Sequence, residues 1–557
     1  MKIAGLLSLG LSTIAFVGAL PTQNKCGNGN GNGNGNGNGG DGKELSLRII
    51  HTNDLHAHYD QFNKYGSDCS DKDIASNSCF GGAARIVTTV NKLREGHPNS
   101  LLFDAGDQAQ GTLFYTVGKF NTTIKVMNQL KYDAMCIGNH EFDDGPDFLA
   151  GFFSKLNFPA ICANIDTTKN PNLAKVVKPY IIIDKYKLGV IGYITNTTGS
   201  ITSSGPTVSF SDAADAVNKY VKVLKEKGIK RIIAVSHNGY HEDMDVAART
   251  HGLDLIVGGH SHTYLSLNAS EPGAGGLYPT IVKNLDGHST YVVQAKAWGE
   301  YVGYVDLEFN KDGSVKKLSG EPIHMTLNVT QDPTMAANIK EWRKPFEAYG
   351  DTVVGNLTAG ISNSNCQLGE CEIGDLVTDA MLWSRNLDTP TDIAIINSGG
   401  IRAGIGSGTT KVKDILLVFP FGNAVVDISL TGAKLKEIIT GIFQKTNIAN
   451  GRPVTSFLQI AGARIKYHPA PGTTTGAKVV DSIEVKSSNG WAPLDESKTY
   501  KAVTLDFIAK GGDNFIDPPS TPPALLGLDV VVENYFNKFS PITPAIAGRL
   551  VDTTKSS

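Results

Sequence analysis

Five apolar segments in the first half of this 557-residue chain are each followed at once by polar residues of the kinds that bind metal ions. These residues are Asp54-Leu55-His56, Gly106-Asp107, Gly138-Asn139-His140-Glu141, His237 and Gly259-His260-Ser261-His262. In open α/β sheets, binding sites lie in the crevice beyond the carboxyl ends of the strands. We therefore predict that the five segments are strands whose polar residues meet at one sheet edge, as a site for more than one metal ion requires.

Apolar segments alternate with helical stretches through the N-terminal part of the chain, and this alternation predicts a layered α/β domain over residues 45–330. Helices are expected over Ala83–Arg94 and Asp212–Lys227. Strands are expected over Leu47–His51, Ser100–Phe103, Ala134–Ile137, Tyr180–Ile183, Leu188–Tyr193, Arg231–Ser236 and Leu253–Val257.

A second α/β region is expected over residues 352–551. Asp332-Pro333 is typical of a helix start and Gly350 of a helix end, so we expect a linker helix within residues 331–351. Strands of the second region are expected over Ile393–Ile396, Val425–Ser429, Ala463–Tyr467 and Tyr500–Leu505.

The types of candidate ligand favour particular metals. Imidazole and carboxylate groups without thiolate suit Zn, Mn, Fe or similar divalent ions, whereas Ca and Mg sites use oxygen ligands. Seven candidates are too many for one tetrahedral ion but suit a pair of ions that share a carboxylate. They are Asp54, His56, Asp107, Asn139, His237, His260 and His262.

Each candidate ligand also has an ordinary explanation when it is taken alone. A single His after a strand is more often a hydrogen-bonded surface or core residue. Asp54 and Asp107 could form turns. Asn139 could adopt a left-handed conformation beside Gly138. The joint occurrence of all these residues in this order is hard to reach by chance.

The order of these motifs resembles the metallophosphoesterase signature D-x-H, G-D, G-N-H-[DE], H, G-H-x-H. Longer matches resemble the 5'-nucleotidase/apyrase family, above all its secreted or surface ecto-5'-nucleotidases, from about Leu45 to Leu550. They are His51-Thr52-Asn53-Asp54-Leu55-His56, Ala105-Gly106-Asp107-Gln108, Gly138-Asn139-His140-Glu141-Phe142-Asp143 and Asn397-Ser398-Gly399-Gly400-Ile401-Arg402. The resemblance implies an N-terminal four-layer metallophosphoesterase domain and a C-terminal α/β nucleotide-binding domain, joined by a helix.

The resemblance also implies which residues hold the two ions. One ion would lie on Asp54, His56 and Asp107, and the other on Asp107, Asn139, His237 and His260. His262 stands where many nucleotidases of this family carry Asn or Gln, and we expect it to bind or neighbour the first ion. Zn is the expected metal, with Mn, Co or Fe as alternatives.

In the family, residues at the positions of His140 and Asp143 form a catalytic pair. The His would contact the phosphate and the leaving oxygen, and the Asp would orient it. A carboxylate on one ring nitrogen favours the imidazolium and fixes the tautomer, so this role is physically sensible. Alternatively, Asp143 caps a helix that starts just before Pro146.

The C-terminal region carries the candidate substrate-binding residues. Asn397 and Arg402 bracket a glycine turn, where the backbone could approach a ligand and Arg402 could bind phosphate. By resemblance, Phe421 and Phe507 sandwich the nucleobase and Asp513 binds the ribose hydroxyls. Either Phe could instead belong to the core.

The short cysteine loop departs from the family pattern. Family members often carry Arg there, whereas this loop reads Cys366-Gln367-Leu368-Gly369-Glu370-Cys371. One charged contact to the substrate is therefore expected to be missing.

Several features predict secretion. Residues 1–19 read as a signal peptide and residues 20–44 as a flexible Gly-Asn-rich tail. The C-terminal residues are not an apolar tail, so we expect no stable membrane anchor. Glycosylation sequons occur at Asn121, Asn196, Asn268, Asn328 and Asn356. Disulfides are expected for Cys69 with Cys79 and Cys366 with Cys371, buried thiols for Cys136 and Cys162, and Cys26 is left over.

The sequence therefore predicts a secreted two-metal 5'-nucleotidase. It would hydrolyse nucleoside 5'-monophosphates such as AMP to nucleoside and phosphate, by in-line attack of water. The expected partner is a small nucleotide, because a net charge of -3 gives no argument for nucleic acid. The alternatives are an apyrase or UDP-sugar hydrolase, and an inactive nucleotide-binding or adhesive surface protein on the same scaffold.

Overall fold

The computed structural model describes residues 44–473, 476–487 and 490–555. The expected signal peptide, the Gly-Asn-rich tail up to residue 43 and Cys26 lie outside the described residues. No helix among the described residues is both long and apolar enough to cross a membrane.

The N-terminal domain contains two large sheets. The first runs in the order β19 (Val315–His324), β18 (Tyr301–Phe309), β1 (Leu45–Thr52), β4 (Ser100–Asp104), β5 (Ala134–Cys136), β6 (Ala160–Ile161) and β8 (Val177–Lys178). The second runs in the order β16 (Thr280–Lys283), β17 (Ser289–Val293), β13 (Leu255–Val257), β12 (Arg231–His237), β10 (Leu188–Ile194) and β9 (Tyr180–Ile183). The strands that precede the candidate ligands pair in parallel with one another, so their carboxyl ends point the same way.

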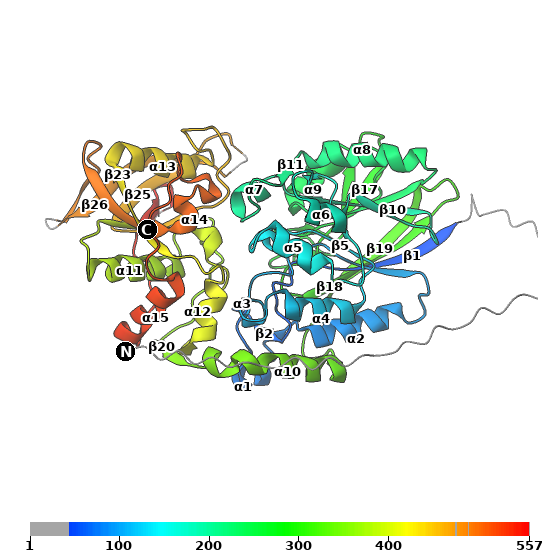
Figure 1. Ribbon diagram of the computed structural model, residues 1–557, viewed down its shortest axis with the longest axis horizontal. Coiled ribbons are helices and arrows are strands. Elements are labelled where there is room, and N and C mark those ends of the chain that lie inside the picture. The colour runs from blue at the N-terminus through cyan, green and yellow to red at the C-terminus, as the bar shows by residue number, and fades with distance from the viewer. Residues whose placement is uncertain (1–43, 474–475, 488–489, 556–557) are drawn as a thin grey trace, which may run out of the picture. The chain divides into compact units, whose positions relative to one another are not determined.

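Helices cover the two sheets on opposite sides. Helices α2 (Ala83–Arg94) and α4 (Phe120–Leu130) lie beside the first sheet, and α8 (Ala213–Glu226) and α9 (Tyr240–Ala248) lie beside the second (Figure 1). The apolar face of each helix packs inward, as the periodicity of its buried residues shows. The four-layer arrangement expected for this domain is thus present.

Side chains of the first sheet alternate between two apolar cores. Leu101 and Phe103 of β4 belong to a core shared with Val190 of β10 and Ile232 of β12, so this core lies between the sheets. Leu102, which points to the other face, belongs to the core beneath α2 and α4. The sheets are therefore buried on both faces where the ligand-bearing strands run, as their apolar sequences predict.

Helix α10 (Pro333–Gly350) follows the N-terminal domain, and the predicted helix is confirmed. The side chain of Asp332 accepts a hydrogen bond from the amide of Met335, and Pro333 stands at the first helical position. Both features stabilise a helix start, because the amides of the first turn have no partner within the helix. Asp332 pairs one of them, and proline at the first position loses no hydrogen bond.

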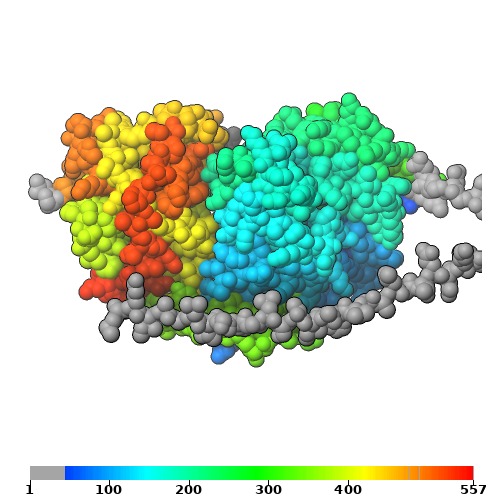
Figure 2. Space-filling model, viewed as in Figure 1, coloured from blue at the N-terminus to red at the C-terminus, as the bar shows by residue number. Residues whose placement is uncertain are grey.

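The C-terminal domain has two four-stranded sheets, and α15 (Leu528–Phe539) lies on its surface, coloured red in Figure 2. One sheet runs β23 (Val425–Thr431), β28 (Thr499–Leu505), β21 (Ile393–Asn397) and β24 (Leu458–Ala461), and the other β27 (Gly490–Pro493), β26 (Lys478–Ser487), β25 (Ala463–Pro469) and β29 (Leu550–Asp552). Its other helices are α11 (Glu372–Asn386), α12 (Val412–Val418), α13 (Gly432–Gln444) and α14 (Asp506–Ala509).

Shorter elements connect these layers. Short helices are α1 (Asp71–Ala75), α3 (Leu113–Thr116), α5 (Pro146–Phe153), α6 (Pro171–Val176), α7 (Thr198–Ile201), η1 (His140–Phe142), η2 (Ser398–Gly400) and η3 (Gly512–Asn514). Two-stranded pairs are β2 (Phe62–Asn63) with β3 (Cys79–Phe80), β7 (Ile165–Asp166) with β11 (Ser209–Phe210), β14 (Leu265–Ser266) with β15 (Gly276–Leu277), and β20 (Val353–Leu357) with β22 (Gly408–Lys411).

The cysteines of the described residues behave as predicted. Disulfides join Cys69 to Cys79 and Cys366 to Cys371, and Cys136 and Cys162 are buried free thiols. The asparagines of all five sequons are exposed, as a glycan would require.

A cluster of charged residues, the Asp68 cluster, joins the N-terminal domain to α10 and α12. The carboxylate of Asp68 accepts hydrogen bonds from Arg343 on α10 and, at 2.7 Å, from Nζ of Lys413 on α12. Arg343 also donates to Asp60 at 2.9 Å, and Lys413 lies 2.9 Å from Asp351. These contacts link the loop after β2 to α10 and to α12.

Candidate metal centre and active site

The strands that precede the candidate ligands lie in two sheets. In the first sheet β1, β4 and β5 are neighbours, and in the second β12 and β13 are neighbours. The expectation of a single sheet edge is therefore wrong, because the two sheets pack face to face and their carboxyl ends meet. This packing brings all seven predicted ligands together.

One group of possible ligands consists of Asp54, His56 and His262. The Nε2 atoms of His56 and His262 lie 3.1 Å apart, and Nε2 of His262 lies 3.3 Å from Oδ1 of Asp54. Asp54 and His56 follow β1, whereas His262 follows β13. This group therefore combines residues of both sheets.

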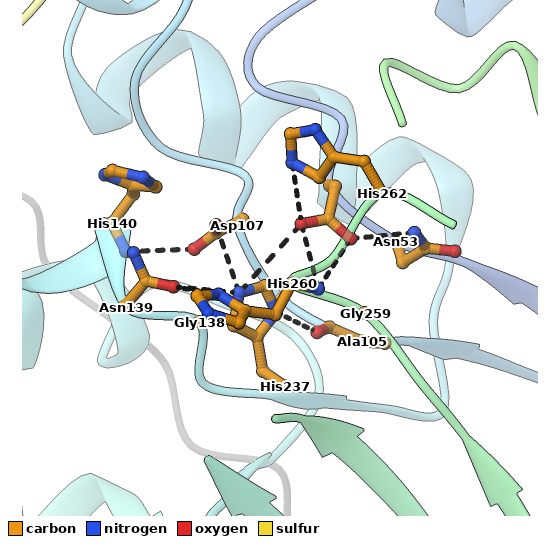
Figure 3. Close-up of polar contacts among 12 residues, drawn as sticks. Asn53, Ala105, Asp107, Gly138, Asn139, His140, His237, Gly259, His260 and His262 are labelled. Atoms are coloured by element: carbon orange, nitrogen blue, oxygen red, sulfur yellow. Dashed lines mark hydrogen bonds and ion pairs between the residues drawn. The ribbon is translucent and has the colours of Figure 1, made fainter. Parts of the chain in front are cut away.

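The second group consists of Asp107, His237 and His260, with Asn139 beside them (Figure 3). Nε2 of His237 lies 3.0 Å from Oδ2 of Asp107. Oδ1 of Asn139 lies 3.1 Å from Nε2 of His237 and 2.8 Å from Nδ1 of His260. Nε2 of His56 is 3.6 Å from Oδ2 of Asp107, so Asp107 lies between the two groups.

The hydrogen bonds of two histidines prepare them to bind cations. Nδ1 of His56 lies 3.1 Å from the carbonyl oxygen of Ala109, and Nδ1 of His237 lies 2.6 Å from that of Ala105. A carbonyl can only accept, so each Nδ1 carries a proton, and Nε2 is the ring nitrogen that faces the centre and offers a lone pair to a cation once it is unprotonated. Lone pairs and carboxylates that converge on a point repel unless a cation lies between them. These nitrogen and oxygen donors therefore fit two divalent ions.

The charges around Asp107 favour a positive group at this point. Burial by itself favours the neutral imidazole of His237, but the charge of Asp107 outweighs it and raises the pKa of His237 to about 10. Burial likewise opposes ionisation of Asp107, but the charges of His237 and His140 hold its pKa well below the usual range. A proton on His237 therefore occupies a place that a cation can take.

Five of the candidate ligands have a left-handed backbone. Their φ angles are 52° for Asp54, 45° for His56, 55° for Asp107, 74° for His260 and 53° for His262. Non-glycine residues adopt this region uncommonly, and each such conformation has an energetic cost of order 1–3 kcal/mol. The strain is held by neighbouring loops, since the amide of Asp54 donates to Gly106 O at 2.9 Å and that of His56 to Asp107 O at 3.0 Å.

Asn139 differs from these five residues. Its φ of -69° and ψ of -36° are right-handed helical values, so the alternative of a left-handed turn former does not hold. Its side-chain oxygen is instead directed at His237 and His260.

His140 lies at the edge of the metal groups and contacts Asp143. Nδ1 of His140 is 2.8 Å from Oδ2 of Asp143. Burial lowers the pKa of His140, but the charges of Asp143 and Asp107 outweigh it and the net pKa is raised. The alternative role for Asp143 is excluded, because Gly145 occupies the cap position of α5.

Residues of the C-terminal domain reach His140. Nη2 of Arg402 lies 3.5 Å from Nε2 of His140, and the ring of Phe421 stacks on the imidazole with centroids 5.4 Å apart. The guanidinium of Arg402 also lies over the Phe421 ring, 5.8 Å from its centroid. Two of the predicted substrate-binding residues are thus brought to the metal centre.

The other three predicted substrate-binding residues lie together in the C-terminal domain. Nδ2 of Asn397 donates to Oδ2 of Asp513 at 2.6 Å, and Oδ1 of Asn397 is buried without a hydrogen-bond partner within the described chain. Phe507 packs against Gly512, where a Cβ atom would collide with its ring. Phe421 and Phe507 are both partly buried, and Phe507 also packs against the apolar core.

The disulfide loop that lacks the expected Arg lies next to the Asn397 turn. The hydroxyl of Ser398 donates to Cys366 O at 2.6 Å. The side chain of Gln367 lies beside Ser456: its Oε1 accepts from the amide of Phe457 at 3.1 Å and its Nε2 donates to Oγ of Ser456 at 3.4 Å, and that hydroxyl oxygen also accepts from the amide of Gly399 in the turn. Gln367 is thus linked to the turn through Ser456, but its neutral amide cannot replace the charge of an Arg.

Two residues of the centre had no role in the sequence prediction. Nδ2 of Asn53 donates to Oδ2 of Asp54 at 2.7 Å and thereby helps to orient it. Glu141 is fully buried and accepts hydrogen bonds from backbone amides behind the ligands. Both lie inside the sequence motifs and close to candidate ligands, and this position is the sequence feature that could have identified them.

Family models match both domains. The model for calcineurin-like phosphoesterases matches residues 47–264, and that for the 5'-nucleotidase C-terminal domain matches residues 353–518. A snake venom 5'-nucleotidase of Gloydius brevicauda is 33% identical over 533 residues, which cover 91% of this chain and 88% of the relative. A 5'-nucleotidase of Homo sapiens is 33% identical over 536 residues, which cover 92% of this chain and 91% of the relative.

Solved structures show the same similarity. The crystal structure of a 5'-nucleotidase precursor from Thermus thermophilus superposes with a TM-score of 0.83 at 32% sequence identity. The match covers 92% of this chain and 100% of that one, so it includes both domains.

Proposed function

The chain belongs to the 5'-nucleotidase family of calcineurin-like phosphoesterases, and we propose that it hydrolyses nucleoside 5'-monophosphates to nucleoside and phosphate. One observation carries the proposal. Two groups of possible metal ligands meet at Asp107, and the same place is reached by His140 and by Arg402 of the C-terminal domain.

In this proposal two divalent ions occupy the centre, and Zn is preferred, with Mn, Co or Fe as alternatives. Asp54, His56, His262 and Asp107 would hold one ion, and Asp107, Asn139, His237 and His260 the other. When bound, such a pair polarises the phosphoryl group and lowers the pKa of water. The hydrogen bonds to Ala109 and Ala105 keep His56 and His237 in the tautomer that can bind.

His140 would act on the phosphate and the leaving oxygen. Asp143 holds its Nδ1 at 2.8 Å, and the charge of Asp143 raises the pKa of His140 and so favours the imidazolium, which carries a proton on Nε2. That proton faces the place where the phosphoryl oxygens would lie. His140 can therefore stabilise developing negative charge and protonate the leaving 5'-oxygen.

The C-terminal domain would bind the rest of the nucleotide. Arg402, beside His140, offers a fork of donors to phosphate oxygens. Phe421 and Phe507 offer partly exposed rings for stacking on the base. Asp513 and the unpaired oxygen of Asn397 offer acceptors for ribose hydroxyls. A hinge motion about α10 would carry the bound nucleoside to the metal centre.

Phosphate release from AMP, ADP, ATP and UDP-glucose tests the proposal. We expect AMP to be hydrolysed with the highest kcat/KM. Turnover of ADP, ATP or UDP-glucose without AMP would identify an apyrase or a sugar-nucleotide hydrolase instead, an alternative suggested by the absence of Arg from the 366–371 loop. A folded protein that contains no metal and turns over none of these compounds would indicate a nucleotide-binding protein.

We also place the enzyme outside the cell. Both disulfides and the exposed sequon asparagines suit an oxidising, glycosylating compartment. Expression of the full chain in a secreting eukaryotic host should give a protein in the medium whose mass falls on treatment with an N-glycosidase. Retention of the unglycosylated chain inside the cell would contradict this placement.

A further inference from the structure

Glu141 is fully buried behind the metal centre, and its carboxylate accepts hydrogen bonds from four backbone amides. Oε2 accepts from Gly138 at 2.6 Å and from Asp107 at 3.0 Å. Oε1 accepts from Gln108 at 2.7 Å and from Ala109 at 3.0 Å. All four partners are donors, so the roughly four lone-pair sites of the carboxylate are all used. Glu141 therefore has no free site with which to bind an ion itself.

The four amides belong to two different loops. Asp107, Gln108 and Ala109 follow β4, whereas Gly138 follows β5. The carboxylate thus joins the ends of two neighbouring strands. These loops approach so closely that a Cβ atom at Gly138 would collide with the backbone of Asp107.

The same segment orients the carboxylate that lies between the two metal groups. The amide of His140, the residue before Glu141, donates to Oδ1 of Asp107 at 2.9 Å. Oδ2 of Asp107 is then left to face Nε2 of His237 at 3.0 Å and Nε2 of His56 at 3.6 Å. The backbone of Asp107 is held by Glu141 in spite of its left-handed φ of 55°.

We propose that Glu141 is the positioning residue that holds Asp107 and Asn139 at the spacing two ions need, so that its loss uncouples the two metal positions. The inference rests on the metal centre proposed above. Asp107 carries the shared carboxylate, and Asn139 directs its oxygen to the second group. Glu141 accepts the backbone amide of Asp107 itself and that of Gly138, the residue before Asn139. Small movements of either loop would change the separation of the two positions.

Glu141→Gln is the informative variant. Its amide keeps one oxygen but turns an NH₂ group toward two backbone amides, which leaves those donors unpaired. The full-length wild type titrated with Mn²⁺ should bind two ions per chain and give the electron paramagnetic resonance spectrum of a coupled pair. In Glu141→Gln we expect affinity for at least one ion to fall about 10–100-fold, and the coupled spectrum to give way to that of isolated Mn²⁺.

Two further variants separate positioning from stability. Glu141→Asp keeps the charge but is shorter, so it should restore part of the coupled spectrum and serves if Glu141→Gln does not fold. Asp254→Asn is the matched control, because Asp254 also accepts a backbone amide, that of Ile232 at 3.0 Å, at the start of β13. It should lower the melting temperature without changing the spectrum.

The outcomes distinguish this inference from the proposed function. A folded Glu141→Gln that binds two Mn²⁺ with wild-type affinity and the coupled spectrum overturns the role of Glu141 alone. A wild type that binds no Mn²⁺, with Zn²⁺ and Co²⁺ also excluded by elemental analysis, overturns the metal centre itself.

Discussion

Nε2 of His140 and Nη2 of Arg402 lie 3.5 Å apart, although 262 positions separate the two residues in the sequence. One belongs to the domain that carries the candidate metal ligands, and the other to the domain that carries the candidate nucleoside-binding residues. Both groups can donate hydrogen bonds to an anion, so a phosphate between them would contact both domains at once. A phosphate site at this point would therefore be shared by the two domains.

Replacing His140 by Ala should lower kcat for AMP about 10²–10⁴-fold, the usual range for a positioned acid or base. His140 belongs to neither group of possible metal ligands, so the metal content should not change. Steady-state kinetics and elemental analysis of the same preparation check both statements. Unchanged turnover would remove His140 from the mechanism, and lost metal would show that it acts through the centre.

Replacing Asp143 by Asn should change the pH dependence rather than the metal content. The charge of Asp143 favours the imidazolium of His140, so its removal lowers the pKa of His140. If the protonated form is the active one, activity is lost as pH rises through this pKa, and the alkaline limb of kcat/KM should move to lower pH. A limb at the wild-type position would contradict the assignment.

Replacing Arg402 by Ala should raise KM for AMP about tenfold or more, because hydrogen bonds to charged groups contribute roughly 1.5–3 kcal/mol. Arg402→Lys should recover only part of this, since Lys lacks the planar fork. The control is Arg385→Ala. Arg385 lies on α11 and forms an ion pair with Asp427 on β23, and loss of this pair should leave KM unchanged. Equal KM values for the wild type and Arg402→Ala would exclude a role in binding.

The Asp68 cluster predicts a pH-dependent stability. Burial raises the pKa of Asp68, but Arg343 and Lys413 outweigh it, and the pKa in the folded state is lowered. Its contribution to stability is therefore present above the unfolded-state pKa of about 3.9 and is lost as pH falls through the folded-state pKa.

Asp68→Asn should accordingly destabilise the protein by roughly 1–2 kcal/mol at pH 7, a value reduced because 34% of the side chain is exposed and screened. The difference from wild type should shrink in acid. Thermal unfolding at several pH values measures it, with Asp184→Asn, which breaks an exposed pair with Lys187, as the control. A difference that does not vary with pH would show that charge is not the cause.

Metal binding should release protons. The pKa of about 10 for His237 means that this imidazole is protonated at neutral pH until a cation replaces the proton. Affinity should therefore fall as pH falls. Calorimetric titration in two buffers of different ionisation enthalpy gives the number of protons released, and we expect about one from this residue at pH 7–8. Release of none would mean that His237 is not a ligand.

Much of the scaffold follows from local sequence. The predicted helix over Ala83–Arg94 has those bounds in the structure, and α10 begins at the expected Asp332-Pro333 signal. Both succeed because caps, apolar periodicity and glycine act within a few residues. The ligand residues could be recognised for a related reason, because each lies at or just after the end of a short apolar segment, and such a segment is typical of a buried strand.

Long-range features did not follow from the sequence. The placement of β12 and β13 in a second sheet depends on strand pairing between distant segments, which no local pattern encodes. The left-handed backbone of His56 and the amide contacts of Glu141 depend on loops that meet only after folding. The contact of Arg402 with His140 likewise depends on how distant segments pack.

Each group of possible ligands draws on both sheets of the N-terminal domain. Asp54 and His56 leave the first sheet and His262 the second, while Asp107 leaves the first and His237 the second. A nascent chain in which only one sheet has formed cannot complete either group. Metal binding would thus come late in folding, after the two sheets of the N-terminal domain have packed correctly against each other.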